Sequence, residues 1–374
     1  MINFYDPHHF TLICELFNAC NLNCDFCVKR SSHQDTTTDI NYITHILPES
    51  LKNTILPELV ERDVNKLLFN IYGGEIFMDS LSDEYFEAYK YLAEVFEDMV
   101  LDKLPNCHVE FATVTNATFK KKERVLKFLE ETNGLTNISY DPEGRYLSEE
   151  QKELARENTK FFIDHDKVSM VTATITKPTI EAIITEKDTF LQDLPKHILF
   201  DLSYYLPMNV DNEKLTPSDD DMFRFFKYLL DNRQFNVSEI NTIIMQYIHP
   251  DIESHSYCHN ARISSRVNDQ VIYNNCCYDM VRRFYEKGME DYFGEYYSLI
   301  QNANEENKRL IGRERRHCLM CPWCDKCPGM CFIAVLSRWS DIGHCYLARS
   351  FEYLQEHPEI VEDYMQFDAG KLVR

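Results

Sequence analysis

The stretch Lys66–Glu75, KLLFNIYGGE, decides the fold that we expect for this chain. It begins as a short apolar run that predicts a buried strand, and it ends in Gly73-Gly74-Glu75. A helical pattern lies on either side of it, at residues 41–64 and 82–104. Glycine is scarce, with 10 in 374 residues, so this Gly-Gly pair stands out, although it would also suit a tight turn.

The same alternation of strand and helix runs through the first part of the chain. The predicted strands cover residues 10–17, 66–72, 109–115, 135–140, 168–176 and 197–206. The predicted helices cover residues 41–64, 82–104, 120–131, 148–163, 179–194 and 218–231. Such units in succession predict a parallel sheet with its helices packed outside it. Because a closed (β/α)8 barrel needs two more units, we expect an α/β fold of the partial (β/α)6 TIM-barrel type, open on one side.

The pattern changes beyond about residue 250, where Tyr, Asn, Arg and Cys become frequent and regular periodicity fades. Such a region cannot build much apolar core alone, and bound metal clusters could supply the missing folding energy. We therefore expect two domains. The first is a partial barrel at residues 1–235, and the second is a bridging helix with a small cysteine-rich domain at residues 236–374.

The composition excludes several classes of function. The formal net charge of −22 argues against a nucleic-acid partner, which would need clustered Lys and Arg. No apolar run approaches the roughly 18 residues of a membrane helix. The N-terminus MINFYDPHHF has no signal-peptide pattern, so we expect a cytoplasmic protein without a membrane partner. Since that compartment is reducing, the 14 cysteines predict metal or redox sites rather than disulfides.

Three cysteines follow the first predicted strand directly. Cys20, Cys24 and Cys27 form a C-x3-C-x2-C motif, with Phe26 just before the third cysteine. Three thiolates can hold three irons of a [4Fe–4S] cluster and leave the fourth iron open to a cofactor. A zinc or structural thiol site is the alternative, although zinc prefers a closed shell of four ligands.

Polar side chains also follow the next predicted strands. Gly73-Gly74-Glu75 ends the second strand, Asn116 follows the third, and Ser139 and Asp141 end the fourth. In parallel βα folds the chemistry lies on the loops at the carboxyl ends of the strands. These residues and the three cysteines therefore predict one site at one end of the sheet, although Asn116 and Ser139 would each also suit a simple cap.

These motifs give residues 8–215 a specific resemblance. CNLNCDFC, GGE, TNATF and ISYD are similar to the cluster loop and the strand-end motifs of the radical S-adenosylmethionine (SAM) superfamily. The resemblance implies that Cys20, Cys24 and Cys27 ligate a [4Fe–4S] cluster whose open iron binds SAM. It further implies contacts to SAM from Gly73, Gly74 and Glu75 at the amino group, Phe26 at the adenine, and Ser139 at the ribose or carboxylate. Asn116 joins this set, although Ala117 stands where the family usually has glycine.

The resemblance also implies the chemistry. An electron from the reduced cluster would cleave the C5′–S bond of SAM and give methionine and a 5′-deoxyadenosyl radical, which abstracts a hydrogen atom from an unactivated carbon. The electron would come from an external donor of the flavodoxin or ferredoxin type.

The C-terminal cysteines resemble a second family pattern. The string HCLMCPWCDKCPGMC at residues 317–331, with further cysteines on both sides, resembles the SPASM domain, which holds two auxiliary [4Fe–4S] clusters. The resemblance implies the outer-cluster ligands Cys318, Cys321, Cys327 and Cys345. It implies the inner-cluster ligands Cys258, Cys276 and Cys331, with either Cys277 as the fourth ligand or an iron left open to substrate. Cys324 is extra, either free or a substitute ligand, and the closely spaced thiolates could instead bind zinc.

SPASM-type radical SAM enzymes mostly modify peptides or proteins, so the resemblance implies a precursor peptide or protein as the partner. We expect a carbon–carbon or thioether cross-link in a ribosomally synthesised peptide. Three alternatives stay open: oxidation of a Cys or Ser to formylglycine, as in anaerobic sulfatase maturases; dehydrogenation or epimerisation of a sugar; and electron transfer without SAM chemistry. Because only about ten residues precede the first predicted strand, we expect no N-terminal peptide-recognition domain, which makes the first alternative a fair rival. Asp279, shortly after Cys276 and Cys277, is a candidate acid–base residue.

Overall fold

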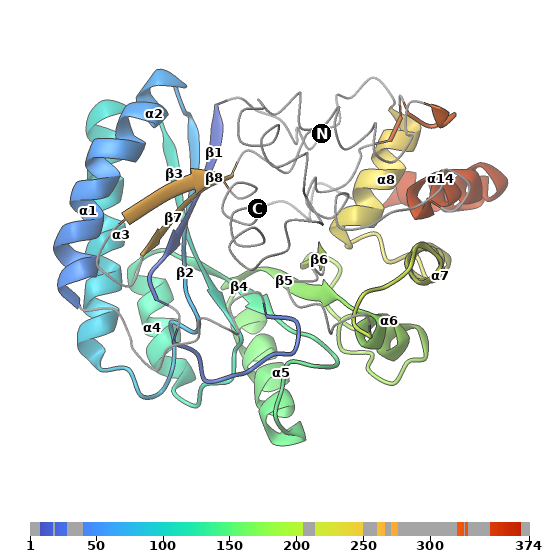
Figure 1. The fold of residues 1–374 in the computed structure, drawn as a ribbon, viewed down its shortest axis with the longest axis horizontal. Helices are drawn as coiled ribbons and strands as arrows, with labels where there is room; N and C mark the ends of the chain where they lie inside the picture. Colours follow the sequence, from blue (N-terminus) through green and yellow to red (C-terminus); the bar gives the residue numbers. More distant parts are fainter. Residues whose placement is uncertain are drawn as a thin grey trace, which may run out of the picture.

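The computed structural model describes residues 8–17, 19–27, 40–204, 214–249, 260–265, 271–275, 320–324, 326–327 and 345–367. In these parts of the chain eight strands form one sheet, in the order β6-β5-β4-β3-β2-β1-β7-β8. Strands β1 to β6 pair in parallel, and they curl into an open half-barrel with helices on its convex side (Figure 1). The expected partial (β/α)6 barrel is therefore confirmed.

The parallel strands lie where the apolar runs predicted them. They are β1 (His9–Glu15), β2 (Lys66–Tyr72), β3 (His108–Thr115), β4 (Leu135–Ser139), β5 (Val168–Ile175) and β6 (Leu199–Tyr204). Two further strands were not predicted. Strand β7 (Asn260–Ser265) pairs in parallel with β1, and β8 (Val271–Asn275) pairs antiparallel with β7. This hairpin extends the sheet beyond β1 with residues that the sequence pattern assigned to the second domain.

The helices of the half-barrel alternate with its strands. They are α3 (Asp83–Lys103), α4 (Lys122–Glu131), α5 (Glu149–Asp164), α6 (Lys177–Ile184) and α7 (Asp219–Asp231), and α8 (Ser238–Ile248) follows α7 without a strand between them. Near the C-terminus, α14 (Tyr346–Glu356) and α15 (Pro358–Gln366) follow. Ser218 caps α7 in a capping box with Asp221, as the sequence predicted for the start of this helix. None of the described helices is both long and apolar enough to cross a membrane.

The first predicted helix, at residues 41–64, is built from alternating α and π turns. It comprises η2 (Tyr42–Ile46), α1 (Leu47–Ser50), η3 (Leu51–Ile55) and α2 (Leu56–Glu61). Pro48 and Pro57 each follow a π-helical stretch. Because proline lacks an N–H and its ring crowds the carbonyl four residues earlier, a locally widened turn lets the helix continue through both positions.

Helix α6 is shorter than predicted, because it ends at Ile184 rather than near Leu194. Glu186 adopts a left-handed backbone with φ of 54°, which an α-helix cannot contain. The apolar residues beyond it, Phe190, Leu191 and Leu194, are still buried in the core. Their segment is irregular, but its apolar side chains pack into the same core as those of α6. Their spacing therefore resembled that of a helix.

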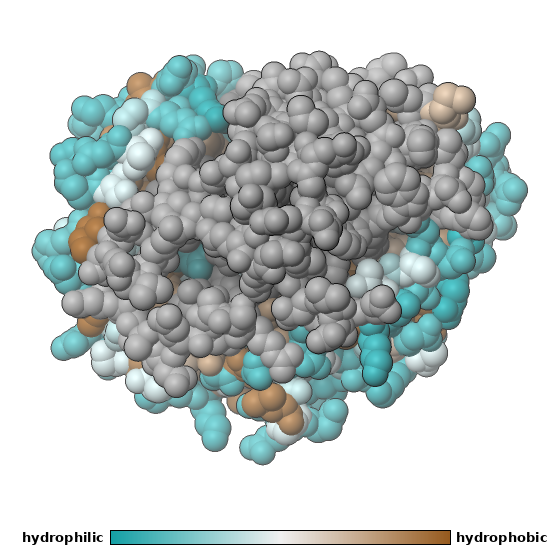
Figure 2. Space-filling model, viewed as in Figure 1, coloured by the Kyte–Doolittle hydropathy of each residue, from teal (hydrophilic) through white to brown (hydrophobic). Residues whose placement is uncertain are grey.

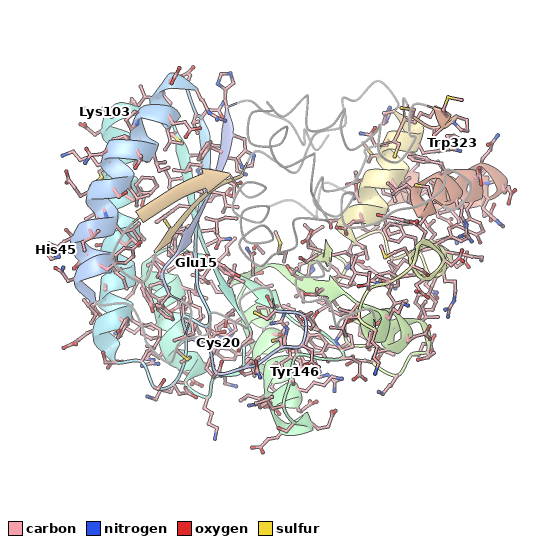
Figure 3. The ribbon with its side chains drawn as sticks, viewed as in Figure 1. Glu15, Cys20, His45, Lys103, Tyr146 and Trp323 are labelled. Atoms are coloured by element: carbon pink, nitrogen blue, oxygen red, sulfur yellow. The ribbon has the colours of Figure 1, made fainter. Side chains whose placement is uncertain are left out.

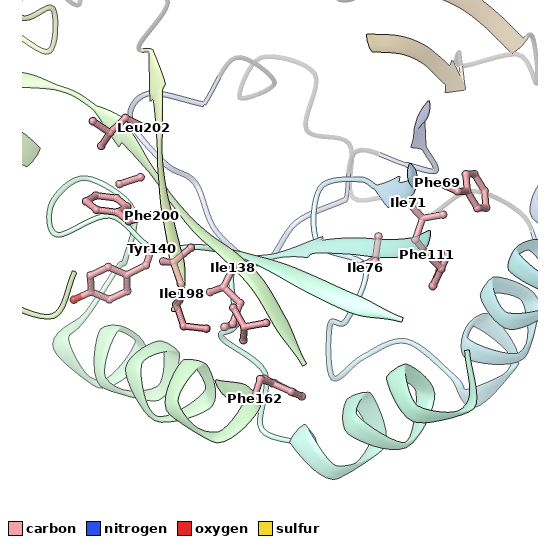
Figure 4. Close-up of a cluster of buried hydrophobic side chains, with 14 of the residues drawn as sticks. Phe69, Ile71, Ile76, Phe111, Ile138, Tyr140, Phe162, Ile198, Phe200 and Leu202 are labelled. Carbon is pink, nitrogen blue, oxygen red and sulfur yellow. The ribbon is translucent and has the colours of Figure 1, made fainter. Parts of the chain in front are cut away.

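The hydrophobic core fills the space between the convex face of the sheet and its helices (Figure 4). Phe69 of β2 packs against Phe96 of α3 at 4.7 Å between ring centroids, and against Phe111 of β3 at 5.8 Å. The described parts of the face in Figure 2 are mostly hydrophilic, with small separate apolar areas. One continuous core thus supports the six parallel strands from outside.

The concave face of the half-barrel carries a polar row. Since Ile138 and Tyr140 belong to the core outside the sheet, strand alternation turns Ser139 toward the concave side. Ser139 pairs with Thr172 of β5, and Thr172 pairs with Asp201 of β6. These three residues therefore form one line across neighbouring strands, facing the open side of the sheet.

Candidate active site

The cysteine loop crosses the carboxyl ends of the strands and is fixed to the end of β2. The backbone N–H of Gly74 donates to the Phe17 carbonyl at 2.8 Å, and that of Glu75 donates to the Ala19 carbonyl at 2.9 Å. A Cβ atom on Gly73 would lie 3.0 Å from the Phe17 carbonyl oxygen. The Gly-Gly pair is thus explained by a close backbone approach, which brings the segment before Cys20 against the GGE motif.

The Glu75 carboxylate joins the ends of β2 and β3. Its Oε1 accepts hydrogen bonds from the Phe77 backbone N–H and the Thr115 hydroxyl, both at 2.9 Å, and its Oε2 accepts one from the Asn116 backbone N–H at 2.7 Å. The side chain is 1% exposed. Burial raises the pKa of Glu75 to about 6, although the donors around it favour the charged form.

Asn116 connects the β3 loop to the first cysteine. Its amide nitrogen lies 3.9 Å from the Cys20 sulfur and donates to Asn21 Oδ1 at 3.0 Å. Its Oδ1 accepts from the Thr118 hydroxyl at 2.6 Å, and that hydroxyl accepts from Asn21 Nδ2 at 2.9 Å. Asn21, Asn116 and Thr118 thus form a closed ring of side-chain hydrogen bonds beside Cys20.

Ala117, next to Asn116, has a left-handed backbone with φ of 56° and is fully buried. This is the conformation that favours glycine, the residue that the family usually has at this position. Asn158 of α5 donates its amide to the carbonyls of Ala117 and Phe119, at 2.8 and 2.7 Å. These two hydrogen bonds from Asn158 therefore stabilise the turn although alanine occupies it.

The three cysteines of the loop lie together, and none of them forms a disulfide. Cys24 is buried with Leu22 and Phe26, and Cys20 and Cys27 pack against this group. Burial raises the pKa of Cys20 to about 12, with the Glu75 charge adding to the effect. Thiols in such surroundings become thiolates only when a bound cation compensates the charge.

The donor set fits an iron–sulfur cluster. Within the described residues no three His, Cys, Asp or Glu side chains come together as a single-ion site. In a cluster each thiolate binds a different iron, so three thiols on one loop suit it, with a fourth iron left open. The zinc alternative would require a closed shell of ligands around one ion.

The β4–α5 loop covers the cysteine loop. The Gly144 carbonyl accepts a hydrogen bond from the Asp25 backbone N–H at 3.0 Å. The Arg145 guanidinium lies 5.3 Å from the centre of the Phe26 ring and is paired with the buried Asp141. Burial opposes the charge on Arg145, but the Asp141 carboxylate outweighs it and raises the pKa of Arg145 above its usual value.

A charged network holds the end of β4 from the convex side. Asp188 Oδ2 accepts from the Tyr140 hydroxyl at 2.8 Å and pairs with Lys152 at 2.7 Å and Arg156 at 2.9 Å. Burial favours the neutral acid, but Lys152 and Tyr140 hold the pKa of Asp188 below its usual value. Tyr140 is thereby fixed between its neighbours, the half-buried Ser139 and the fully buried Asp141.

Four C-terminal cysteines lie in the described residues: Cys321, Cys324, Cys327 and Cys345. Burial raises the pKa of Cys321, and negative charge on Cys345 and Cys324 adds to it, so these thiols are neighbours. Trp323 stacks on Phe351 of α14 at 5.4 Å, which holds the segment on that helix. The predicted ligands Cys258, Cys276, Cys277, Cys318 and Cys331, and the candidate acid–base residue Asp279, lie outside the described residues.

Sequence reasoning missed three residues at this site: Asn21, Arg145 and Tyr146. Tyr146 packs against the group of Leu22, Cys24 and Phe26. Figure 3 shows Cys20 and Tyr146 at the same end of the sheet. A usable signal was Gly144, a rare glycine with φ of 79° directly before Arg145 and Tyr146.

Comparisons with known proteins give a likeness in structure only. No protein-family model and no curated protein matches the sequence. Native anSMEcpe with bound AdoMet (SAM) and the Cp18Cys peptide matches with a TM-score of 0.60 and 15% identity, over 96% of this chain and 99% of that one. Histidine-tagged anSMEcpe with bound AdoMet matches with a TM-score of 0.62 and 16% identity, over 95% and 98% of the two chains. This chain therefore shares its fold with anSMEcpe, and that likeness agrees with the resemblance in its motifs.

Proposed function

We propose that this chain is a radical SAM enzyme that modifies a peptide. One observation carries the proposal: Glu75 and Asn116 join the ends of β2 and β3 to the cysteine loop, with the Asn116 amide 3.9 Å from the Cys20 sulfur. The sequence motifs expected to serve one site thus meet at one end of the half-barrel. When bound, the cluster and SAM would supply an electron and a 5′-deoxyadenosyl radical.

The residues of this chain would bind and orient these groups. Cys20, Cys24 and Cys27 would hold the cluster. Gly73, Gly74, Glu75, Asn116, Ser139 and Phe26 would surround SAM. Arg145 keeps a positive charge beside the Phe26 ring, so it would balance part of the negative charge of the thiolates. The polar row from Ser139 through Thr172 to Asp201 would line the path of the substrate on the concave face.

A peptide is the substrate class that the observations favour. The half-barrel is open on one side, and the fold matches, over nearly its whole length, a protein solved with a bound peptide. Cys321 and its neighbour Cys345, with Cys327 of the same segment as Cys321, would hold an auxiliary cluster that accepts an electron from the substrate. The product we propose first is a carbon–carbon or thioether cross-link in a ribosomally synthesised peptide.

Oxidation of a peptide Cys or Ser to formylglycine is the second candidate. The observation that favours it is the likeness in fold to anSMEcpe, an anaerobic sulfatase-maturating enzyme, along both chains. The two products differ in reactivity. An aldehyde-reactive hydrazide labels formylglycine and leaves a cross-link unlabelled, so labelling followed by peptide mass spectrometry separates them.

The test of the shared chemistry is anaerobic reconstitution with iron and sulfide, followed by dithionite, SAM and mass spectrometry for 5′-deoxyadenosine. We expect about twelve irons per chain from one SAM-binding and two auxiliary clusters. A C20A/C24A/C27A variant should lose about four irons and all deoxyadenosine. The control is C107A, which removes a buried free thiol just before β3. A fully loaded protein that makes no deoxyadenosine, even with candidate peptides, would leave electron transfer as the function.

A further inference from the structure

Tyr146 carries a buried hydroxyl beside the cysteine loop. Its ring is partly exposed, but its hydroxyl oxygen is buried and has no hydrogen-bond partner among the residues that the structure describes. Buried hydroxyls are normally paired, so an orphaned one that lies beside a candidate binding loop points to a bound group as its partner.

The surroundings of Tyr146 identify that group. The ring packs against Leu22, Cys24 and Phe26, the cluster of side chains that Cys20 and Cys27 also contact. The Cys24 sulfur itself lies 3.8 Å from the Arg145 carbonyl, in the residue directly before Tyr146.

The phenol can act there as a donor, because its hydroxyl carries a proton at its ordinary pKa of about 10. The hydrogen-bond acceptors that a bound iron–sulfur cluster offers are its sulfur atoms.

We propose that the Tyr146 hydroxyl donates a hydrogen bond to a sulfur atom of the cluster held by Cys20, Cys24 and Cys27. This inference rests on the proposed function, because that function supplies the cluster. Reduction adds one electron from the external donor to the cluster and makes its sulfurs more negative. A hydrogen bond to sulfur stabilises the reduced state and so raises the reduction potential.

Arg145 supports this assignment, because the same loop places its charge beside the cysteine loop. With Asp141 as its partner, its guanidinium is fixed at 5.3 Å from the centre of the Phe26 ring. The β4–α5 loop thus brings both a cation and a neutral donor to the cluster. These two residues of the β4–α5 loop would set how readily the cluster takes its electron.

The test is an anaerobic redox titration of reconstituted Y146F, followed by electron paramagnetic resonance. The signal to follow is the one that the C20A/C24A/C27A variant lacks, which separates it from the auxiliary clusters. We expect the equilibrium constant for reduction to fall about tenfold, a shift of about 59 mV for one electron. The matched control is Y89F, whose hydroxyl is also buried without a partner among the described residues but lies on α3 in the hydrophobic core.

A potential of Y146F equal to that of the unchanged protein would overturn the proposal. If Y146F assembles no cluster, a measurement on the unchanged protein tests the proposal instead. Protein labelled with ring-deuterated tyrosine should show deuterium coupling to the reduced cluster by electron–nuclear double resonance, and absence of coupling would overturn the proposal. If the proposed function is wrong, the unchanged protein itself will lack the resonance signal that the C20A/C24A/C27A changes are expected to remove. This outcome differs from both results above.

Discussion

Glu75 Oε2 accepts the backbone N–H of Asn116 at 2.7 Å, so a single carboxylate ties the GGE turn of β2 to the loop after β3. Its other oxygen accepts two more donors, from Phe77 and Thr115. Glu75 therefore shapes the site through backbone groups, besides any contact that it makes with SAM.

The E75Q variant tests this bracing role. An amide nitrogen in place of one carboxylate oxygen would face a donor, so at least one buried hydrogen bond becomes a repulsion. We expect the free energy of unfolding to fall by about 1–3 kcal/mol and the affinity for SAM to fall with it. Thermal unfolding and titration calorimetry with SAM measure both. E84Q, an exposed change on α3, is the control, and equal stability of E75Q and E84Q would contradict the idea.

Ala117 offers a stabilising change. A left-handed backbone costs an L-residue about 1–2 kcal/mol. Glycine avoids this cost but loses about 0.5–1 kcal/mol in conformational entropy on folding. We therefore expect A117G to raise the free energy of unfolding by up to about 1 kcal/mol. A155G, at a buried position within α5, should instead lower it, because glycine weakens a helix. Chemical denaturation compares the two variants, and a loss of stability in A117G would show that the methyl contributes packing.

Asp201 and Glu239 should make stability depend on pH. The Ser238 hydroxyl lies 2.8 Å from Asp201 Oδ1 and 2.7 Å from Glu239 Oε2, and its single proton serves only one of them. One carboxyl must therefore carry a proton. Burial, with the Asp201 charge added, raises the pKa of Glu239 well above its usual value, and burial raises that of Asp201.

The direction in which the free energy of unfolding changes with pH follows from proton binding. Each acid binds its proton more tightly in the folded state than in the unfolded chain, so this stability is complete below the unfolded pKa values near 4. It is lost as the pH rises through the folded pKa values, by up to about 1.4 kcal/mol per pH unit for one proton. E239Q should flatten this decline between pH 5 and 8, and the exposed change E150Q should not. Parallel slopes for E239Q and the unchanged protein in urea unfolding would refute the assignment.

Trp323 should be needed for the C-terminal cluster. Its ring stacks on Phe351 and lies 6.4 Å from the Tyr247 ring, which fixes the segment of Cys321–Cys327 on α14 and α8. We expect W323A to lose about four irons per chain while it keeps the signal of the SAM-binding cluster. W323F should retain the stacking and the iron. Iron content equal to that of the unchanged protein in W323A would exclude this role.

The half-barrel could be predicted from sequence because each of its strands and helices has a local signal. The apolar run of β2 and the capping serine of α7 are examples. The pairing of β7 with β1 could not, because NARISS at residues 260–265 has only two apolar residues and its partner lies far away in sequence. Long-range pairing of this kind leaves little trace in a local pattern.

Likewise, only some residues of the candidate site could be predicted from the sequence. Cys20, Cys24, Cys27, Glu75 and Asn116 could be found because their motifs follow strand ends directly. Arg145 and Tyr146 could not, because their positions depend on how the β4–α5 loop folds back over Phe26. Their residue types alone are common on protein surfaces.

The position of β1 inside the sheet has a consequence for synthesis of the protein. Although it is the first strand of the chain, it has β2 on one side and β7, at residues 260–265, on the other. While the ribosome is still translating the segment between them, one edge of β1 stays open to other chains. Nascent chains that stall before residue 260 should therefore aggregate or recruit chaperones, and those that pass residue 275 should be protected by the hairpin that caps this edge.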